Sequence, residues 1–287
     1  MAQIVGIYAA THKPVLLNFP DQVTAAEREH VYDAFQHLGR RLAQSGADTV
    51  VIVSDDHMHN FFLDNLPAFC IGAADSYRTP IEPWLAAEPR VLKGDADLGA
   101  YLTGEALQSG FDPSFSMELT LDHGTLTPLE LAGFDNSIAV VPLLINCVQP
   151  PLPTLRRCIA LGRFLRRALV DYQGCERVAI LATGGLSHDV GTPRMGMVNE
   201  EFDREFLRLL AQRDDDALVA YSDSHLDQAG NGAEEIRTWL VAYGAANGTP
   251  VDVISYRPLP GWYIGACVAE WPSTVGTEPR IRPQLHE

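Results

Sequence analysis

The feature that most constrains the fold of this chain is the alternation of short apolar runs with segments of helical periodicity. Residues 3–10 and 49–54 are continuous apolar, β-branched runs, the pattern of strands buried on both faces. Between them, Thr24 and Glu27 form a capping-box sequence, and Gly46 supplies a stop signal for a helix. A strand, a helix and a second strand in this order predict a parallel pair of strands joined by a helical crossover.

The same alternation continues along the chain. Residues 138–145 and 177–182 form two more apolar runs, and the segment 154–172 between them carries apolar residues at helical spacing. The remaining expected elements are helices over 199–213 and 232–246 and strands over 251–256 and 263–269. We therefore predict an α/β fold: a single catalytic domain over residues 1–287, with a mainly parallel, twisted central sheet flanked by helices on both faces. An irregular tail is expected from about residue 272.

Charge and cysteine content exclude several classes of protein. The formal net charge of −16 argues against a nucleic-acid partner, which needs a surplus of lysine and arginine. No stretch approaches the roughly 20 apolar residues of a membrane span, and the first residues do not form a secretory signal. The five cysteines form no C-x-x-C pair, so neither a disulfide framework nor a thiolate zinc site is indicated. We expect a soluble, cytoplasmic protein with reduced thiols.

Four histidines occupy short contexts at or near the ends of the apparent strands. His12, His57 and His188 follow apolar runs, and His123 begins a turn-rich stretch. Side chains at the carboxyl ends of strands in an open α/β sheet converge on one rim, where such sheets bind ligands. Four histidines placed in this way predict a metal site combined with acid/base groups.

Two of these histidines are candidates for metal ligands. His12 and His57 would supply imidazole nitrogens for iron or zinc, and an oxygen ligand would complete a facial triad with open positions. In the tandem Glu234–Glu235, a rotation of about 100° per residue places Glu235 beside the buried stripe of the late helix and Glu234 roughly opposite it. Glu235 is therefore the better candidate, although both glutamates could simply favour the positive end of the helix dipole. His123 and His188, each expected in a glycine-containing turn, are candidate proton carriers.

Other patterns leave alternatives open. His57 and His59 invite a D-H-x-H zinc interpretation, but this stretch leaves its strand, so His59 is more simply part of a pocket wall or surface. Gly184 and Gly185 could form a phosphate-binding turn, yet no Walker lysine or G-x-G-x-x-G accompanies them, and no G-x-S-x-G elbow is present. The proline- and aromatic-rich segment 61–97 is either one wall of a pocket or a packed surface excursion.

Taken together, the motifs resemble the class III extradiol ring-cleavage dioxygenases. They occur in the family order and cover roughly residues 5 to 270. The matching segments are Thr11-His12-Lys13-Pro14, Asp56-His57 with Phe61-Phe62 and Leu66 to Gly72, Asp122-His123-Gly124 with Pro128-Leu129, Gly184 to His188, and Glu235 to Trp239.

The resemblance implies that His12, His57 and Glu235 bind one Fe(II), and that His188 and His123 are the acid/base pair. The sequence does not decide how these two histidines divide the acid and base roles, and we favour His188 as the principal base. The resemblance also implies a catechol-type substrate cleaved with O2, and a homo-oligomer with or without a separate small partner subunit, since none is fused here. Lys13, Arg78 or Arg194 could neutralise a substrate carboxylate or could be ordinary surface charges. A zinc hydrolase using the same pocket and a non-catalytic subunit are the alternatives, and the presence of all five site residues disfavours the second.

Overall fold

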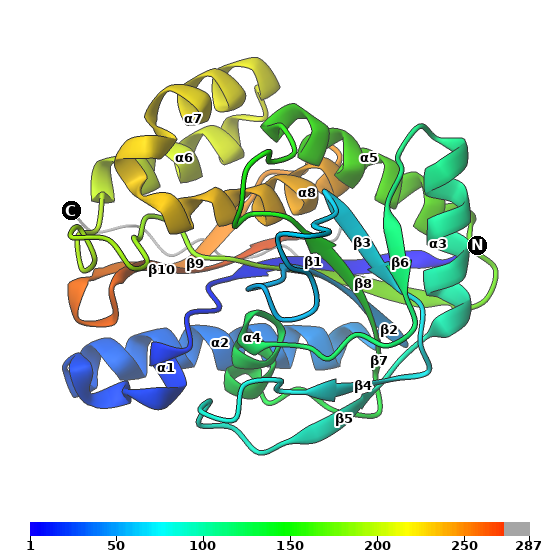
Figure 1. The fold of residues 1–287 in the computed structure, drawn as a ribbon, viewed down its shortest axis with the longest axis horizontal. Coiled ribbons are helices and arrows are strands. Elements are labelled where there is room, and N and C mark those ends of the chain that lie inside the picture. The colour runs from blue at the N-terminus through cyan, green and yellow to red at the C-terminus, as the bar shows by residue number, and fades with distance from the viewer. Residues whose placement is uncertain (273–287) are drawn as a thin grey trace.

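The computed structural model describes residues 1–272, which form ten strands and eight α-helices (Figure 1). The strands are β1 (Gln3–Ala10), β2 (Thr49–Asp55), β3 (Phe69–Gly72), β4 (Ser76–Thr79), β5 (Arg90–Lys93), β6 (Ser114–Ser116), β7 (Ala139–Ile145), β8 (Arg177–Thr183), β9 (Asp252–Leu259) and β10 (Ile264–Trp271). The helices are α1 (Val15–Asn18), α2 (Ala25–Ser45), α3 (Ala96–Gln108), α4 (His123–Ala132), α5 (Leu155–Asp171), α6 (Glu200–Gln212), α7 (Asp215–Ala229) and α8 (Ile236–Ala246). Three short 3-10 helices span Pro20–Gln22, Asn231–Glu235 and Pro260–Trp262.

Eight of the strands form one sheet in the order β6-β3-β7-β2-β8-β1-β10-β9. The central strands β7, β2, β8 and β1 run parallel to one another, whereas β3 is antiparallel to β7, and β10 is antiparallel to both β1 and β9. The predicted α/β fold with a mainly parallel sheet is therefore confirmed. Since β1, β2 and β8 point the same way, the residues that follow them lie along one edge of the sheet.

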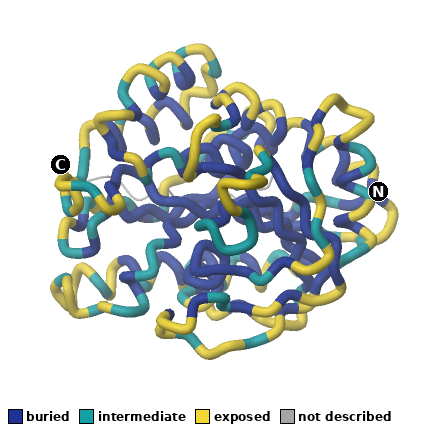
Figure 2. The backbone as a smooth tube through the Cα atoms, viewed as in Figure 1, coloured by how far each residue is buried: buried dark blue, intermediate teal, exposed yellow. Residues whose placement is uncertain are grey.

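The sheet is covered on both faces because the side chains of its central strands alternate between two cores. Val51 and Val53 of β2 join one apolar cluster with Trp239 of α8 and residues of α5, while Val50 and Ile52 join the other with Phe35 of α2. In Figure 1, α5 and α8 lie above the sheet and α2 and α4 below it. Figure 2 shows the central strands almost wholly buried between these layers.

Capping residues account for the start and the end of the long helix α2, which the sequence predicted. Thr24 and Glu27 form the full capping box of α2, and Gly46 ends the helix in the left-handed conformation, with φ 64°. The helix expected over 232–246 begins instead as the 3-10 helix Asn231–Glu235 and becomes α-helical at Ile236. Helices α3, α4 and α7 were not predicted from the sequence, and α4 contains Pro128, a residue that normally argues against a helix interior.

Three further expectations concern the C-terminal tail, membrane-spanning helices and the cysteines. The irregular tail predicted from about residue 272 lies outside the described residues, apart from Pro272 itself. Among residues 1–272, none of the helices is long and apolar enough to cross a membrane. The five cysteines are all free thiols in the described part of the chain, and four of them are buried.

Candidate metal centre

The carboxyl edge of the sheet brings three of the predicted site residues together. His12, His57 and His188 each lie a few residues beyond the end of a parallel strand, respectively β1, β2 and β8. His123 is different from the prediction: it does not lie in a turn but is the first residue of α4. Asp122 is the N-cap of this helix, accepting a hydrogen bond from the backbone N–H of Gly124 at 2.9 Å, which is why a helix can begin there.

Four side chains form a compact cluster at this edge: His12, Asp55, His57 and Glu235. One ligand atom from each lies within 4.8 Å of the others, and three of the four residues are buried. His12 Nε2 lies 3.1 Å from Glu235 Oε2, and His57 Nε2 lies 3.9 Å from Glu235 Oε1. Imidazole nitrogens and carboxylate oxygens at this spacing are the donor set of a divalent transition metal.

The second ring nitrogen of His12 is held by a hydroxyl group. Nδ1 lies 3.4 Å from Thr183 Oγ1, and that hydroxyl itself donates to Ser54 Oγ at 2.8 Å. Because the Thr183 proton is already used, its oxygen accepts from Nδ1–H, and the lone pair of a neutral His12 ring is on Nε2, facing the cluster.

A carboxylate fixes the orientation of His57 in the same way. Asp122 Oδ2 accepts hydrogen bonds from His57 Nδ1 at 2.9 Å and from its backbone N–H at 3.0 Å. A carboxylate behind the imidazole leaves Nε2 free for a metal and makes that nitrogen a stronger ligand. The His57 side chain is 23 % exposed whereas that of His12 is 1 % exposed, so the cluster is open to solvent on the His57 side.

Glu235 reaches the cluster because two glycines let the backbone approach closely. Gly185 N–H donates to Glu235 Oε2, and a Cβ placed on Gly184 would lie 2.9 Å from the Glu235 carbonyl oxygen. Trp239 Nε1 donates to the Gly184 carbonyl at 2.9 Å, which fastens the loop after β8 to α8. The glycine pair therefore serves close packing around the cluster.

His188 lies on the other side of Glu235. Its Nδ1–H donates to the Leu186 carbonyl at 2.9 Å, and its Nε2 lies 3.3 Å from Glu235 Oε1. The ring is fully buried, and a Cβ on Gly232 would lie only 2.1 Å from Nε2. Since Nδ1 contacts the Leu186 carbonyl, Nε2 is the ring nitrogen that faces the cluster, where a proton acceptor would act.

His123 joins the cluster from α4 and is held by a buried carboxylate from a distant loop. Glu82 Oε1 accepts from His123 Nδ1 at 2.5 Å, and Oε2 accepts from its backbone N–H at 3.0 Å. The His123 and His57 rings are 4.0 Å apart between centroids. His59 does not join the cluster of His12 and Glu235 but lies 3.2 Å from Glu82 Oε1.

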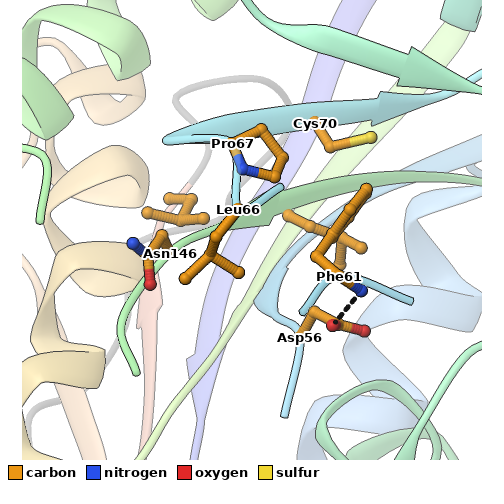
Figure 3. A pocket seen from close by; sticks show the side chains of 8 residues that line it. Asp56, Phe61, Leu66, Pro67, Cys70 and Asn146 are labelled. Atoms are coloured by element: carbon orange, nitrogen blue, oxygen red, sulfur yellow. Dashed lines mark hydrogen bonds between the residues drawn. The ribbon is translucent and has the colours of Figure 1, made fainter. Parts of the chain in front are cut away.

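The segment 61–97 supplies part of the surroundings of the site. It carries Glu82, and its residues Phe61, Leu66, Pro67 and Cys70 line a small hollow beside Asp56 and Asn146 (Figure 3). In Figure 3 the Asp56 carboxylate accepts from the backbone N–H of Phe61, at 3.0 Å. Asp56 thus shapes the loop that follows β2, although it adjoins the ligand candidate His57.

Burial and charge shift the ionisation of the clustered groups. Burial raises the pKa of Asp55 to about 6, against the opposing effects of His57 and His12. Burial also acts to raise the pKa of Glu235 and to lower that of His12, but the pairing of the two groups outweighs it in both cases. The cluster therefore favours positive charge at its centre, and a metal cation would displace protons from the imidazoles.

Sequence reasoning missed three residues of this site: Asp55, Glu82 and Asp122. The sequence does show aspartates beside two of the histidines, since Asp55 and Asp56 precede His57 and Asp122 precedes His123. It does not indicate which of these carboxylates faces a histidine side chain. Glu82 gave no local signal at all, because it is 41 residues away from its partner His123.

These features describe an α/β protein with a candidate metal centre at the carboxyl ends of its parallel strands. Comparison with known proteins shows to which family this protein belongs. Residues 6–266 match the family described as the catalytic LigB subunit of aromatic ring-opening dioxygenase. A 2,3-dihydroxyphenylpropionate/2,3-dihydroxicinnamic acid 1,2-dioxygenase from Rhodococcus sp is 30% identical over 314 residues, covering 91% of this chain and 96% of the relative. A protein of the same name from Paraburkholderia xenovorans (strain LB400) is 32% identical, covering 77% of this chain and 84% of that protein.

A solved structure supports the fold. The crystal structure of the uncharacterized protein JW3007 from Escherichia coli K12 has a TM-score of 0.58 and 18% sequence identity, and the match covers 83% of this chain and 91% of that one.

The chain belongs to the LigB family of aromatic ring-opening dioxygenases, the class III extradiol enzymes, as the motif resemblance implied. It is therefore an enzyme, an oxidoreductase of the dioxygenase class.

Proposed function

We propose that this enzyme is an Fe(II)-dependent extradiol dioxygenase that opens the ring of a catechol-type substrate and incorporates both atoms of O2. The observation that carries the proposal is the convergence of His12 Nε2, His57 Nε2 and a Glu235 oxygen within 4.8 Å of one another. Two imidazoles and one carboxylate are the facial triad of non-haem iron oxygenases.

The surroundings of the triad fit a metal ion. In each imidazole the other nitrogen is held by an acceptor, Thr183 Oγ1 or the Asp122 carboxylate, so Nε2 is preset as the ligand atom. His12 Nε2 is buried and has no hydrogen-bond partner among residues 1–272, as expected for a metal ligand. Fe(II), when bound, would supply positions at which both catechol oxygens and O2 meet and a path for electrons between them.

We assign the first proton transfer to His188. Its Nδ1–H is used by the Leu186 carbonyl, so Nε2 is the nitrogen that can take a proton from a catechol hydroxyl. The proton is returned to an oxygen of the reacting group as the ring opens. The Glu235 carboxylate lies 3.3 Å from His188 Nε2 and would stabilise the protonated imidazole until that proton is returned.

His123 is the second member of the proposed acid/base pair. Burial and the positive charge of His57 lower the pKa of His123 to about 4, and the hydrogen bond to Glu82 opposes this shift. The ring is therefore neutral near pH 7 before substrate binds, with Nδ1–H donated to Glu82 and Nε2 available to a second hydroxyl group.

Lys13 is the best-placed of the three basic residues that could bind a substrate carboxylate. It follows His12 directly, is half-buried, and interacts electrostatically with Glu235, Asp189 and Asp55. Arg194 is paired with Asp189, and Arg78 is exposed. Together with the names of the relatives, this favours catechols that carry an acidic side chain, such as 2,3-dihydroxyphenylpropionate.

The proposal also includes a cytoplasmic location and a homo-oligomeric state, with or without a small partner subunit. The free thiols among the described residues fit a reducing compartment. Light scattering of the purified protein and of the protein drawn from its native cells would measure the oligomeric state and reveal a partner chain.

The test of the function is anaerobic reconstitution with Fe(II), followed by O2 uptake and absorbance measurements with protocatechuate, gallate, 3-O-methylgallate and 2,3-dihydroxyphenylpropionate. One O2 consumed per substrate, with a new yellow chromophore, is the expected result. An iron-loaded protein that consumes no O2 across the panel would contradict the proposal for these substrates. Replacing Lys13 with Met should raise KM for acidic catechols and leave that for unsubstituted catechol nearly unchanged.

Zinc is the alternative to iron as the metal of this centre, because one observation favours it. Nitrogens of His12, His57 and His123 also lie within 4.8 Å of one another, and three imidazoles form a donor set that suits zinc. O2-dependent ring opening by the Zn(II) protein would support zinc, whereas O2-dependent turnover restricted to the Fe(II) protein would exclude it.

A further inference from the structure

We propose that Asp203 is a positioning residue for His188: its carboxylate holds Ser187, the residue directly before His188 in the chain. The inference deepens the proposed function and rests on it for the role of His188 as the base. Asp203 lies outside the clusters that could hold a metal among residues 1–272, and the sequence motifs did not single it out.

Asp203 is a buried carboxylate on the apolar side of a helix. It lies in the first turn of α6, and its exposed fraction is 0 %. The other buried residues of this helix are apolar, among them Phe202, Phe206 and Leu207. Because a buried charge has to be removed from water, it is a poor source of folding stability, and its contacts indicate what else it does.

Both oxygens of Asp203 accept hydrogen bonds from Ser187. Oδ1 accepts from the backbone N–H of Ser187 at 2.7 Å, and Oδ2 accepts from Ser187 Oγ at 2.7 Å and from the Tyr256 hydroxyl at 2.8 Å. Burial raises the pKa of Asp203 to about 6 although these hydrogen bonds act to lower it, so the group is mainly ionised at pH 7. Hydrogen bonds to an ionised acceptor are roughly twice as strong as those between neutral groups. The carboxylate therefore fixes Ser187 by its backbone and its side chain together.

The remaining contacts of Ser187 come from two other segments. Its Oγ accepts from the backbone N–H of Asn199 at 2.9 Å, and its carbonyl oxygen accepts from the N–H of Gly265, in β10, at 3.0 Å. A Cβ placed on Gly265 would lie only 2.0 Å from Asp203 Oδ2, so β10 packs directly against the carboxylate. Ser187 is fully buried, and Asp203 lies at the centre of the contacts that fix it.

The position of Ser187 determines where the His188 ring lies. Nδ1 of His188 contacts the Leu186 carbonyl at 2.9 Å, so the residues on both sides of this contact are joined through Ser187. The His188 carbonyl oxygen accepts from the N–H of Gly232 at 3.1 Å, which holds the far side of the same segment. Rotation of the peptide at Ser187 would move the Leu186 carbonyl and tilt Nε2 away from the cluster. A displacement of about 1 Å can lower the rate of a catalysed step about 100-fold.

The main experiment compares Asp203→Asn with the wild type in the full-length protein. The amide offers one acceptor oxygen in place of two, so kcat for O2 uptake with 2,3-dihydroxyphenylpropionate should fall about tenfold or more. KM for the catechol and the dissociation constant of Co(II), measured on metal-free protein, should stay close to those of the wild type, because Asp203 contacts none of the proposed ligands.

Asp215→Asn is the matched control. Asp215 also lies in the first turn of a helix, α7, and accepts from a tyrosine hydroxyl, that of Tyr243, at 2.9 Å. This variant should keep the wild-type kcat. An unchanged kcat in Asp203→Asn would overturn the proposal, and so would a parallel loss of Co(II) affinity, which would show that the whole centre is disturbed.

A double variant tests whether Asp203 acts through Ser187. Ser187→Ala removes the hydroxyl contact and should also lower kcat. If the two residues act as one unit, the double variant Ser187→Ala, Asp203→Asn should be no slower than the slower single variant. Losses that multiply would mean that Asp203 acts on the reaction by another route, and would overturn the proposal.

Nuclear magnetic resonance tests the positioning without catechol or O2. In long-range 1H–15N spectra of the metal-free protein, the imidazole signals of His188 should shift or broaden in Asp203→Asn, whereas those of the exposed His30 should not change. Unchanged His188 signals would overturn the proposal. Should Asp203→Asn fail to fold, Ser187→Ala serves for both measurements, since it removes one of the same hydrogen bonds.

The two kinds of measurement keep the failures apart. A wild-type protein that consumes no O2 would contradict the proposed function, and the imidazole spectra would still show whether Asp203 positions His188.

Discussion

Asp122 and His57 are joined by two hydrogen bonds, from the Nδ1 and from the backbone N–H of His57 to Asp122 Oδ2. The other oxygen of Asp122 caps α4, the helix that begins with His123. One carboxylate thus orients a proposed metal ligand and starts the helix that carries a proposed acid/base group. The hydrogen bonds and the charge of His57 overcome the effect of burial and keep the pKa of Asp122 well below its usual value.

The Asp122→Asn variant should bind the metal about 10–100-fold more weakly, because its amide cannot strengthen the basicity of His57 as a carboxylate does. The dissociation constant of Co(II) measures this effect. Asp95→Asn is a control for helix capping, since Asp95 caps α3 and lies outside the clusters that could hold a metal. Equal loss of Co(II) affinity in both variants would show that capping alone matters.

Glu82→Gln should lower kcat about tenfold or more while the bound metal stays stoichiometric, since Glu82 contacts His123 and none of the three proposed ligands. The carboxylate raises the pKa of His123, so its loss should also move the acidic limb of the pH–rate profile of kcat. Glu88→Gln, an exposed change in the same segment, provides the comparison. A normal kcat and pH profile in Glu82→Gln would argue against a catalytic role of His123.

The buried, neutral state of His123 should make stability depend on pH. Its pKa is about 4 in the folded chain and about 6.5 when unfolded. Between these values the unfolded chain binds a proton that the folded chain does not, so this contribution to stability falls as the pH drops from 6.5 toward 4. The difference in unfolding free energy between wild type and His123→Asn should shrink by up to about 2 kcal/mol from pH 7 to pH 4.5. Urea unfolding of the two chelator-treated proteins measures this difference in unfolding free energy at each pH. A difference that stays constant with pH would show that the pKa of His123 is not lowered in the folded chain.

Gly232→Ala should nearly abolish turnover, because the added Cβ would overlap His188 Nε2 and displace the proposed base. The oxygen-uptake rate at saturating catechol measures the loss, expected to be at least about 100-fold for a mispositioned base. Gly104→Ala, in α3 with no neighbour within 4 Å of its new Cβ, should leave the rate unchanged and stabilise the fold by about 0.5–1 kcal/mol. An active Gly232→Ala enzyme would remove His188 from the proposed mechanism.

His57→Ala and Glu235→Ala should abolish iron binding, whereas His188→Ala should retain iron and lose ring opening. The reason is that the first two side chains supply proposed ligand atoms, while His188 supplies a proton acceptor at Nε2. Iron content after desalting and single-turnover O2 uptake separate the two effects. A fully active, iron-loaded Glu235→Ala variant would disprove the ligand assignment.

Elements whose signals lie in neighbouring residues could be predicted from the amino-acid sequence. The apolar runs of β1 and β2 and the capping box of α2 predicted a parallel α/β sheet, because strand burial and helix capping leave their pattern in neighbouring residues. Strand polarity then placed His12, His57 and His188 at one edge, and helix periodicity favoured Glu235 over Glu234. The motif resemblance named the same residues and the family.

Which carboxylates face the histidines depends on the folded arrangement of the chain and could not be predicted from the sequence. Asp55 and Asp56 are adjacent in sequence, yet one points into the cluster and the other caps a loop, because the end of β2 sends successive side chains in different directions. Glu82 meets His123 across 41 residues, and its loop has no periodicity that predicts the contact. Buried charges are fixed by partners distant in sequence, and those contacts exist only once the sheet has formed.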